Sequence, residues 1–144
     1  MIKEIKQQFF ALRNGIIADL FRKAEFPYTV VFGLQLPQLT DMARNFAENH
    51  SASELSAVSD ILLSEKNVRE SRLLAFCLLH YIKEEVELNR CLELCRSVQT
   101  QEEADILAFR LLRHLPYSDM LYNILNDDEN EGSRRSAISL KRFL

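Results

Sequence analysis

Apolar side chains recur every three or four residues between residues 2 and 23 of the chain. This spacing places them along one side of an α-helix, so the pattern predicts a single buried helix over residues 2–23 that continues through Gly15. The next stretch, residues 25–35, combines Pro27 with a run of β-branched and aromatic residues and with Gly33. Because proline and glycine interrupt regular structure, this stretch predicts an extended connection.

The remaining chain alternates helical periods with short polar breaks. Ser51 and Glu54 have the spacing of a capping box, in which each side chain bonds the backbone N–H of the other, so they mark a predicted helix start. The helices predicted after residue 35 cover residues 37–49, 51–62, 68–83, 88–95, 101–115, 118–125 and 134–144. Short connections between these segments favour antiparallel helix pairs.

One pattern in this region occurs twice. The stretch that begins at Glu70 returns at Glu103, an offset of 33 residues, with apolar residues at matching positions. Residues suited to cap a helix stand at the same offset: Asn67, Thr100 and Ser133. A repeat of roughly 20 to 50 residues is typical of solenoids, in which each helix pair buries its apolar face against its neighbours. We therefore predict an all-α fold in one domain over residues 1–144, a right-handed superhelix (α-solenoid) of about four HEAT-like antiparallel helix pairs.

The composition fits this fold and narrows the class of protein. Of the 144 residues, 47% are hydrophobic and 27% are charged, and three Gly and three Pro leave little turn material for a β-sandwich or barrel. No apolar run reaches the roughly 18 residues needed to cross a bilayer, and the charged N-terminus is unlike a signal peptide. We therefore expect a cytoplasmic protein without a membrane partner.

The cysteines and histidines do not predict a metal site. Cys77, Cys91 and Cys95 are an odd number of cysteines in a chain without a secretion signal, which favours reduced thiols that pack in the core. Cys91 and Cys95 could share a helix face, but no second pair is spaced to complete a tetrahedral zinc site. We therefore expect no metal and no cofactor. Structural roles are expected for the histidines, which fall on separate helix ends or faces: His50, His80 and His114.

The net charge of −3 argues against a protein that coats nucleic acid by bulk electrostatics. The second helices of the predicted pairs nevertheless carry ten basic and six acidic side chains, a net charge near +4. These helices cover residues 37–49, 68–83, 101–115 and 134–144. In a superhelix they would line one surface, so a modestly basic face is one interpretation. The other is that Lys and Arg are simply favourable in helices.

Two adjacent arginines, Arg134 and Arg135, stand at the start of the last predicted helix. Cations there oppose the positive end of the helix dipole and cost about 0.3 to 1 kcal/mol, so their presence calls for another reason. A phosphate group would provide one, because Arg offers a planar fork of donors and a helix start offers free N–H groups. The alternative is neutralisation by the acidic residues 127–131 just before them.

Three segments, in this order, resemble elements of one known family. Residues 31–39 are similar to its Gly-Val-x-x-Pro-x-Leu-Arg segment, residues 62–75 to a short loop followed by Glu-x-Arg-x-x-Ala, and residues 134–138 to Arg-Arg-x-Ala-Ile. This is the HEAT-like DNA alkylation repair family, the AlkD-type DNA glycosylases, which remove alkylated bases such as 3-methyladenine and 7-methylguanine. The resemblance covers most of the chain.

The resemblance also implies a candidate site. The active centre of the family combines an Asp and an Arg with tryptophans that approach the damaged nucleotide. Asp105 matches the Asp, whose carboxylate can stabilise a developing oxocarbenium cation, and Arg135, or alternatively Arg134, matches the Arg. The tryptophan four residues before the Asp falls at Gln101, and the sequence contains no Trp. The repeats of the family also continue past the position of Leu144.

Two functions are therefore expected. The first is a catalytically degenerate family member that acts as a binding module for the DNA backbone or for a protein partner, and the second is an active DNA glycosylase that excises 3-methyl or 7-methyl purines. The catalytic residue of the second would be Asp105. The candidate DNA-binding residues are Arg135, Arg134, Arg142, Lys141, Arg110 and Arg113.

Overall fold

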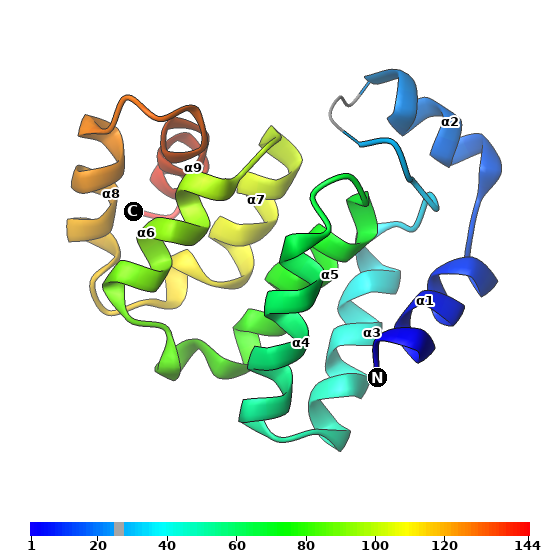
Figure 1. The fold of residues 1–144 in the computed structure, drawn as a ribbon. Helices are drawn as coiled ribbons and strands as arrows, with labels where there is room; N and C mark the ends of the chain where they lie inside the picture. The colour runs from blue at the N-terminus through cyan, green and yellow to red at the C-terminus, as the bar shows by residue number, and fades with distance from the viewer. Residues whose placement is uncertain (25–27) are drawn as a thin grey trace. The chain divides into compact units, whose positions relative to one another are not determined.

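The computed structural model describes residues 1–24 and 28–144 of the chain, and within these ranges it confirms the predicted all-α class. The described residues form helices and, in place of any strand, one isolated parallel bridge between Val30 and Val68. The α-helices are α1 (Ile2–Ala11), α2 (Gly15–Ala24), α3 (Leu36–Asn49), α4 (Ala52–Ser64), α5 (Arg69–Leu79), α6 (Leu88–Ser97), α7 (Gln101–Arg110), α8 (Ser118–Asp127) and α9 (Glu131–Lys141) (Figure 1). Two short 3₁₀ helices follow α5 and α7, namely η1 (His80–Glu85) and η2 (Leu112–His114).

The described chain divides into two compact units, Met1–Leu78 and Leu79–Leu144. Each unit packs helix on helix, as a solenoid does, and the helices follow one another in the predicted order. The single domain over residues 1–144 and the right-handed superhelix stay predictions. No helix in the described ranges is both long enough and apolar enough to span a membrane.

The predicted single helix over residues 2–23 is wrong, because the chain breaks between α1 and α2. The Asn14 side-chain oxygen accepts hydrogen bonds from the backbone N–H groups of Ile16 and Ile17, both at 3.1 Å, and so caps α2. The Asn14 backbone N–H donates to the carbonyl oxygen of Phe32 at 2.8 Å. Asn14 thus starts a new helix where the apolar period alone predicted continuity.

The extended connection is confirmed from Tyr28 to Gln35, while residues 25–27 lie outside the described residues. Gly33 has a positive φ of 87°, and a Cβ there would lie 2.3 Å from the carbonyl oxygen of Asn14. Glycine therefore allows this segment to pass directly against the start of α2.

A buried ion pair holds the same connection from the other side. The Glu70 carboxylate, with a side chain 0% exposed, accepts hydrogen bonds from the backbone N–H groups of Phe32, Gly33 and Leu34 at 2.9, 3.1 and 3.3 Å. Arg69, 2% exposed, donates to the same carboxylate at 2.6 Å and to the carbonyl oxygen of Leu34 at 2.9 Å. The first unit is therefore organised around a long-range bond between α5 and the connection.

This arrangement corrects two predictions about α5. Asn67 was expected to cap this helix, but α5 begins at Arg69, two residues later, and the carboxylate of Glu70 bonds the distant connection. Arg69 and Arg72 were counted on a basic surface, but both are buried. Arg72, 1% exposed, donates to the carbonyl oxygen of Leu63 at 2.9 Å.

In the second unit, α9 packs against α6, α7 and α8 (Figure 1). The predicted cap Thr100 is confirmed, because its hydroxyl accepts from the backbone N–H of Glu103 at 3.1 Å. The predicted cap Ser133 is wrong. The cap of α9 is Asn130, and Ser133 lies inside the helix, where its hydroxyl donates to Asp128 at 2.8 Å.

The cysteines lie in the core, as expected. Cys77, Cys91 and Cys95 are buried free thiols. The hydrogen bond between the Cys91 and Cys95 thiols, together with burial, raises the pKa of Cys95 well above its usual value. A thiol held in its neutral form in the core packs as a small apolar side chain. The described residues contain no group of His, Cys, Asp and Glu side chains that could hold a metal ion.

Candidate nucleic-acid interface

Asp105 lies in the middle of α7 with its side chain 42% exposed. Three donors converge on its Oδ1 atom: the Ser139 hydroxyl at 2.6 Å, the Gln101 side-chain amide at 3.3 Å and the Arg142 guanidinium at 3.5 Å. Ser139 lies in α9 and Arg142 directly follows it, so the bonds to Asp105 connect α7 with α9. The positive charge of Arg142 partly offsets the charge of this carboxylate.

Gln101, in the first turn of α7, connects the same two helices. Its Nε2 atom donates to the Ser139 hydroxyl at 2.7 Å and lies 3.4 Å from the backbone carbonyl oxygen of Arg135. The Ser139 hydroxyl in turn donates to Asp105. An ordered chain of hydrogen bonds therefore runs from Gln101 through Ser139 to Asp105, at the position where the family resemblance places a tryptophan ring.

Arg135 and Arg134 lie in the first half of α9. Arg135 is about one-third exposed and lies 3.9 Å from Glu131, one turn earlier, while Arg134 is exposed. Among the described residues, the cation that pairs with Asp105 is Arg142 rather than Arg135. In the part of the chain that the structure describes, Arg135 is linked to Asp105 through its backbone carbonyl and Gln101. The role of Arg135 that the resemblance implies therefore stays a prediction.

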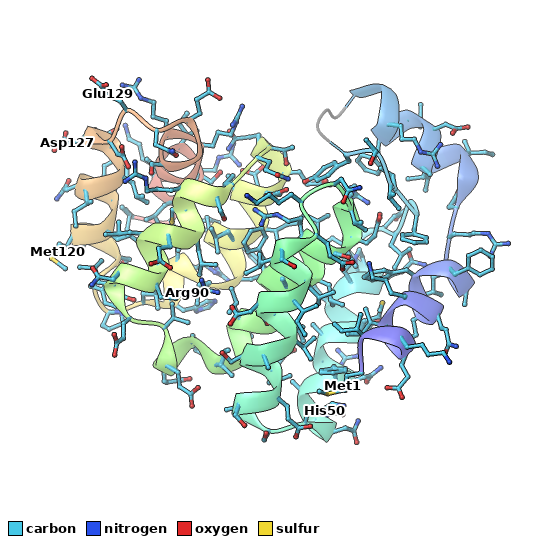
Figure 2. All side chains as sticks on the ribbon, viewed as in Figure 1. Met1, His50, Arg90, Met120, Asp127 and Glu129 are labelled. Carbon is cyan, nitrogen blue, oxygen red and sulfur yellow. The ribbon has the colours of Figure 1, made fainter. Side chains whose placement is uncertain are left out.

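The acidic residues before α9 do not gather on these arginines. Figure 2 shows Asp127 and Glu129 at the connection between α8 and α9, with side chains that point outward. Asp128 bonds the start of α9 and lies 3.6 Å from Arg96 on α6, and hydrogen bonds from the backbone N–H of Asn130 and from Ser133 lower the pKa of Asp128. Of this tract, Glu131 is the carboxylate that pairs with Arg135.

The other candidate cations lie toward the C-terminal ends of α7 and α9. Arg113, in η2, donates to the carbonyl oxygen of Phe109 at 2.7 Å, and its guanidinium lies 4.0 Å from the Phe109 ring centroid and 5.3 Å from that of Phe143. The two rings are 6.1 Å apart, so the ends of α7 and α9 are neighbours. We refer to Asp105 and the six candidate cations together as the α7–α9 patch. Its cations are Arg110, Arg113, Arg134, Arg135, Lys141 and Arg142.

Sequence reasoning missed two histidines beside this patch. His80 and His114 were expected on separate helix ends, but their ring centroids lie 5.2 Å apart. The repeat was the signal that could have found them, because the 33-residue offset carries His80 to position 113, next to His114. Stacked repeats bring equivalent positions side by side.

A comparison with protein families matches the family described as DNA alkylation repair enzyme to residues 5–143, nearly the whole chain. This match confirms the resemblance drawn from the three sequence segments. No curated protein and no solved structure matches the chain significantly.

Proposed function

The chain belongs to the family of DNA alkylation repair enzymes, and on this premise we propose that it binds duplex DNA through the α7–α9 patch without excising bases. The observation that carries the proposal is the state of Asp105. Its Oδ1 atom is already bonded by Ser139, Gln101 and Arg142. A carboxylate stabilises an oxocarbenium-like transition state by its negative charge, and here the Oδ1 atom of that carboxylate is engaged by internal donors.

The tryptophan that the family resemblance implies four residues before Asp105 is also replaced, by Gln101. A base that leaves the helical stack is held by stacking, and a cationic alkylated base gains further from a π face. The sequence has no Trp, and Gln101 presents an amide that is tied into the hydrogen-bond chain to Ser139. Polar tethering of α7 to α9 thus replaces base recognition in this proposal.

The cations of the patch supply the affinity for DNA. Six Lys and Arg side chains lie in the second unit along α7, η2 and α9, against Asp105 and Glu131 as the carboxylates paired with them. Phosphate contacts release counterions, so binding should weaken as salt rises. Arginine also allows bidentate contacts with phosphate oxygens.

Binding can be tested with a labelled 16-base-pair duplex and fluorescence anisotropy. We expect Arg135→Ala and Arg142→Ala each to weaken binding about three- to tenfold, on the order of the loss of one phosphate contact. Arg90→Ala is the matched control, since Arg90 lies on α6 in the same unit and outside the patch (Figure 2). Binding that is absent, or equally weak in all three variants, would instead favour a protein partner.

Active base excision is the second candidate, and one observation favours it. Asp105 is accessible and lies next to Arg142, so a carboxylate and a cation share one surface. Release of 3-methyladenine or 7-methylguanine from alkylated DNA separates the two candidates. We expect no release above background from the wild-type chain. Release that disappears in Asp105→Asn would establish the enzyme and overturn the proposal of binding without excision.

A further inference from the structure

His80 and His114 form a pair beside the end of α7 that the proposed DNA interface does not explain. The Nδ1 atom of His80 donates to the carbonyl oxygen of Arg110 at 2.8 Å, which fixes the ring at the C-terminal end of α7. The rings of His80 and His114 meet edge to face, and the His80 ring meets that of Tyr81 in the same way at 5.1 Å. Within the described residues, the ring nitrogens of His114 and the Nε2 atom of His80 have no hydrogen-bond partner.

Cations surround this pair from three elements. Arg110 on α7, Arg113 in η2 and Lys83 in η1 all act electrostatically on both rings. Among the described residues, the acidic group bonded to this cluster is Glu84, which lies 3.7 Å from Lys83. Like charges held together without a counter-charge at their centre repel one another, so the cluster is destabilised unless an anion is bound.

Arg110 carries charged donors that the described residues leave unpaired. Its Nε and Nη2 atoms are shielded from solvent and have no acceptor among the described residues. The guanidinium carbon lies 5.6 Å from the centroid of the Tyr81 ring, a distance at which the cation–π interaction is weak. Shielded donors of a charged group are normally paired, because they otherwise forfeit their hydration without compensation.

We propose that His80, His114, Arg110 and Arg113 form a binding site for a phosphate-class anion, and that anion binding is coupled to protonation of the two histidines. An anion that displaces the groups shielding Nε and Nη2 of Arg110 would supply the acceptor that these atoms lack among the described residues. It also offers negative charge to two imidazoles that become donors when protonated. Burial first and then the surrounding cations lower the pKa of both histidines, although the hydrogen bond to the Arg110 carbonyl raises that of His80, and the lowered pKa favours the neutral rings.

The source of the anion is either a free phosphate or a phosphodiester of DNA, and only the second source rests on the proposed function. The two sources share the same recognition chemistry. They differ in whether a duplex, whose phosphates are fixed in a backbone, can place one of them against the histidine pair.

NMR titration of the histidine side chains tests the site in the full chain. Inorganic phosphate at constant ionic strength should raise the pKa of His80 and His114 by about 0.5 to 1 unit, equivalent to a three- to tenfold gain in phosphate affinity on protonation. His50 is the internal control. It lies at the C-terminal end of α3, stacked on Phe46 and 3.2 Å from Glu54, and it should shift no more than it does with chloride (Figure 2).

Variants decide whether the response belongs to this cluster. Arg110→Gln and Arg113→Gln should each reduce the phosphate-induced shift by at least half, while Arg90→Gln should leave it unchanged. Equal shifts at all three histidines, no shift, or a full response in Arg110→Gln and Arg113→Gln would overturn the site.

A duplex identifies the source. If DNA supplies the anion, affinity for the 16-base-pair duplex should rise about three- to tenfold from pH 7.5 to pH 6, and His114→Gln should remove most of that rise. If only inorganic phosphate moves the histidines, the site stands and its ligand is a free phosphate. If the duplex binds but neither probe moves the histidines, the anion site is refuted while the proposed DNA interface stands.

Discussion

Replacement of Glu70 by glutamine should strongly destabilise the protein, because every partner of this buried carboxylate is a donor. Its Oε1 atom accepts from the backbone N–H of Phe32, and its Oε2 atom accepts from Gly33, Leu34 and Arg69. Glutamine keeps the shape but presents one NH₂ group. In either orientation of the amide, its NH₂ group therefore faces at least one N–H donor. Arg69 also loses the negative charge that balances its own.

The size of the effect follows from burial. The side chains of Glu70 and Arg69 are 0% and 2% exposed, so solvent cannot replace what is lost. Breaking one side of a buried ion pair costs roughly 3–5 kcal/mol. Total stability of a domain is about 5–15 kcal/mol, so this is a large fraction. For a chain of this size the corresponding fall in Tm is on the order of 10 °C.

Urea denaturation followed by circular dichroism measures the change in free energy of unfolding. Glu54→Gln is the matched control, since Glu54 is also a carboxylate that accepts from a backbone N–H at 3.1 Å, but in an exposed capping box. We expect a much smaller loss for it, because water can replace its partners. A loss below about 1 kcal/mol in Glu70→Gln, indistinguishable from the control, would refute a buried bond between α5 and the connection.

Other substitutions and conditions test further contacts. Gly132→Ala should lower the free energy of unfolding, measured by urea denaturation, by about 1–3 kcal/mol. A Cβ at Gly132 would lie 2.6 Å from two carbonyl oxygens at the end of α6. An alanine variant as stable as the wild type would contradict this close approach. Burial lowers the pKa of His80 and His114, so near pH 6.5 the folded state binds fewer protons than the unfolded chain. The free energy of unfolding should therefore be highest above this pH and should decline as the pH falls through it. Denaturation midpoints that do not change between pH 7.5 and 5.5 would contradict the assignment. Burial raises the pKa of Tyr117 to about 12, so ultraviolet titration should show one tyrosine that ionises well above the usual range. The Tyr117→Phe variant should lack this ionisation. Its free energy of unfolding should also fall by about 0.5–1.5 kcal/mol, because the 2.6 Å hydrogen bond to the Val86 carbonyl is lost.

The sequence predicted the helices well where local signals and packing agree. The capping box of Ser51 and Glu54 and the cap at Thr100 are both present, since these bonds depend on residues three positions apart. The break before α2 was missed because the apolar period runs through it. Ile16 and Leu20, which continue the period, are in fact exposed, and periodicity alone does not distinguish an exposed apolar side chain from a buried one.

Long-range partners explain the other errors. Glu70 stands where a capping box would use it, yet its partners are 36 to 38 positions away in the chain. Counting Arg69 and Arg72 toward a basic face assumed that charge lies on the surface, whereas an ion pair and backbone carbonyls hold both residues inside the first unit. Sequence spacing does not reveal such partners.

In the candidate site, too, the local helix could be predicted from the sequence, but the long-range contacts could not. The sequence pattern predicted a helix over residues 101–115, which contains Asp105, and the structure confirms that Asp105 lies in α7. Its bonds to Ser139 and Arg142 arise only when α9 packs on α7, 34 and 37 positions further along the chain. Gln101 could be recognised from the sequence as the replacement of an aromatic residue, but its role as a polar tether required the packed helices.

The salt dependence of duplex binding tests the central claim most directly. We predict that the logarithm of the association constant falls linearly with the logarithm of salt concentration, with a slope of about −3.5 to −5.5, as expected for roughly four to six neutralised phosphates. Arg135→Ala and Arg142→Ala should each make the slope shallower by about 1, and Arg90→Ala should not. A slope near zero, or one that none of the patch variants changes, would contradict a DNA interface on α7 and α9.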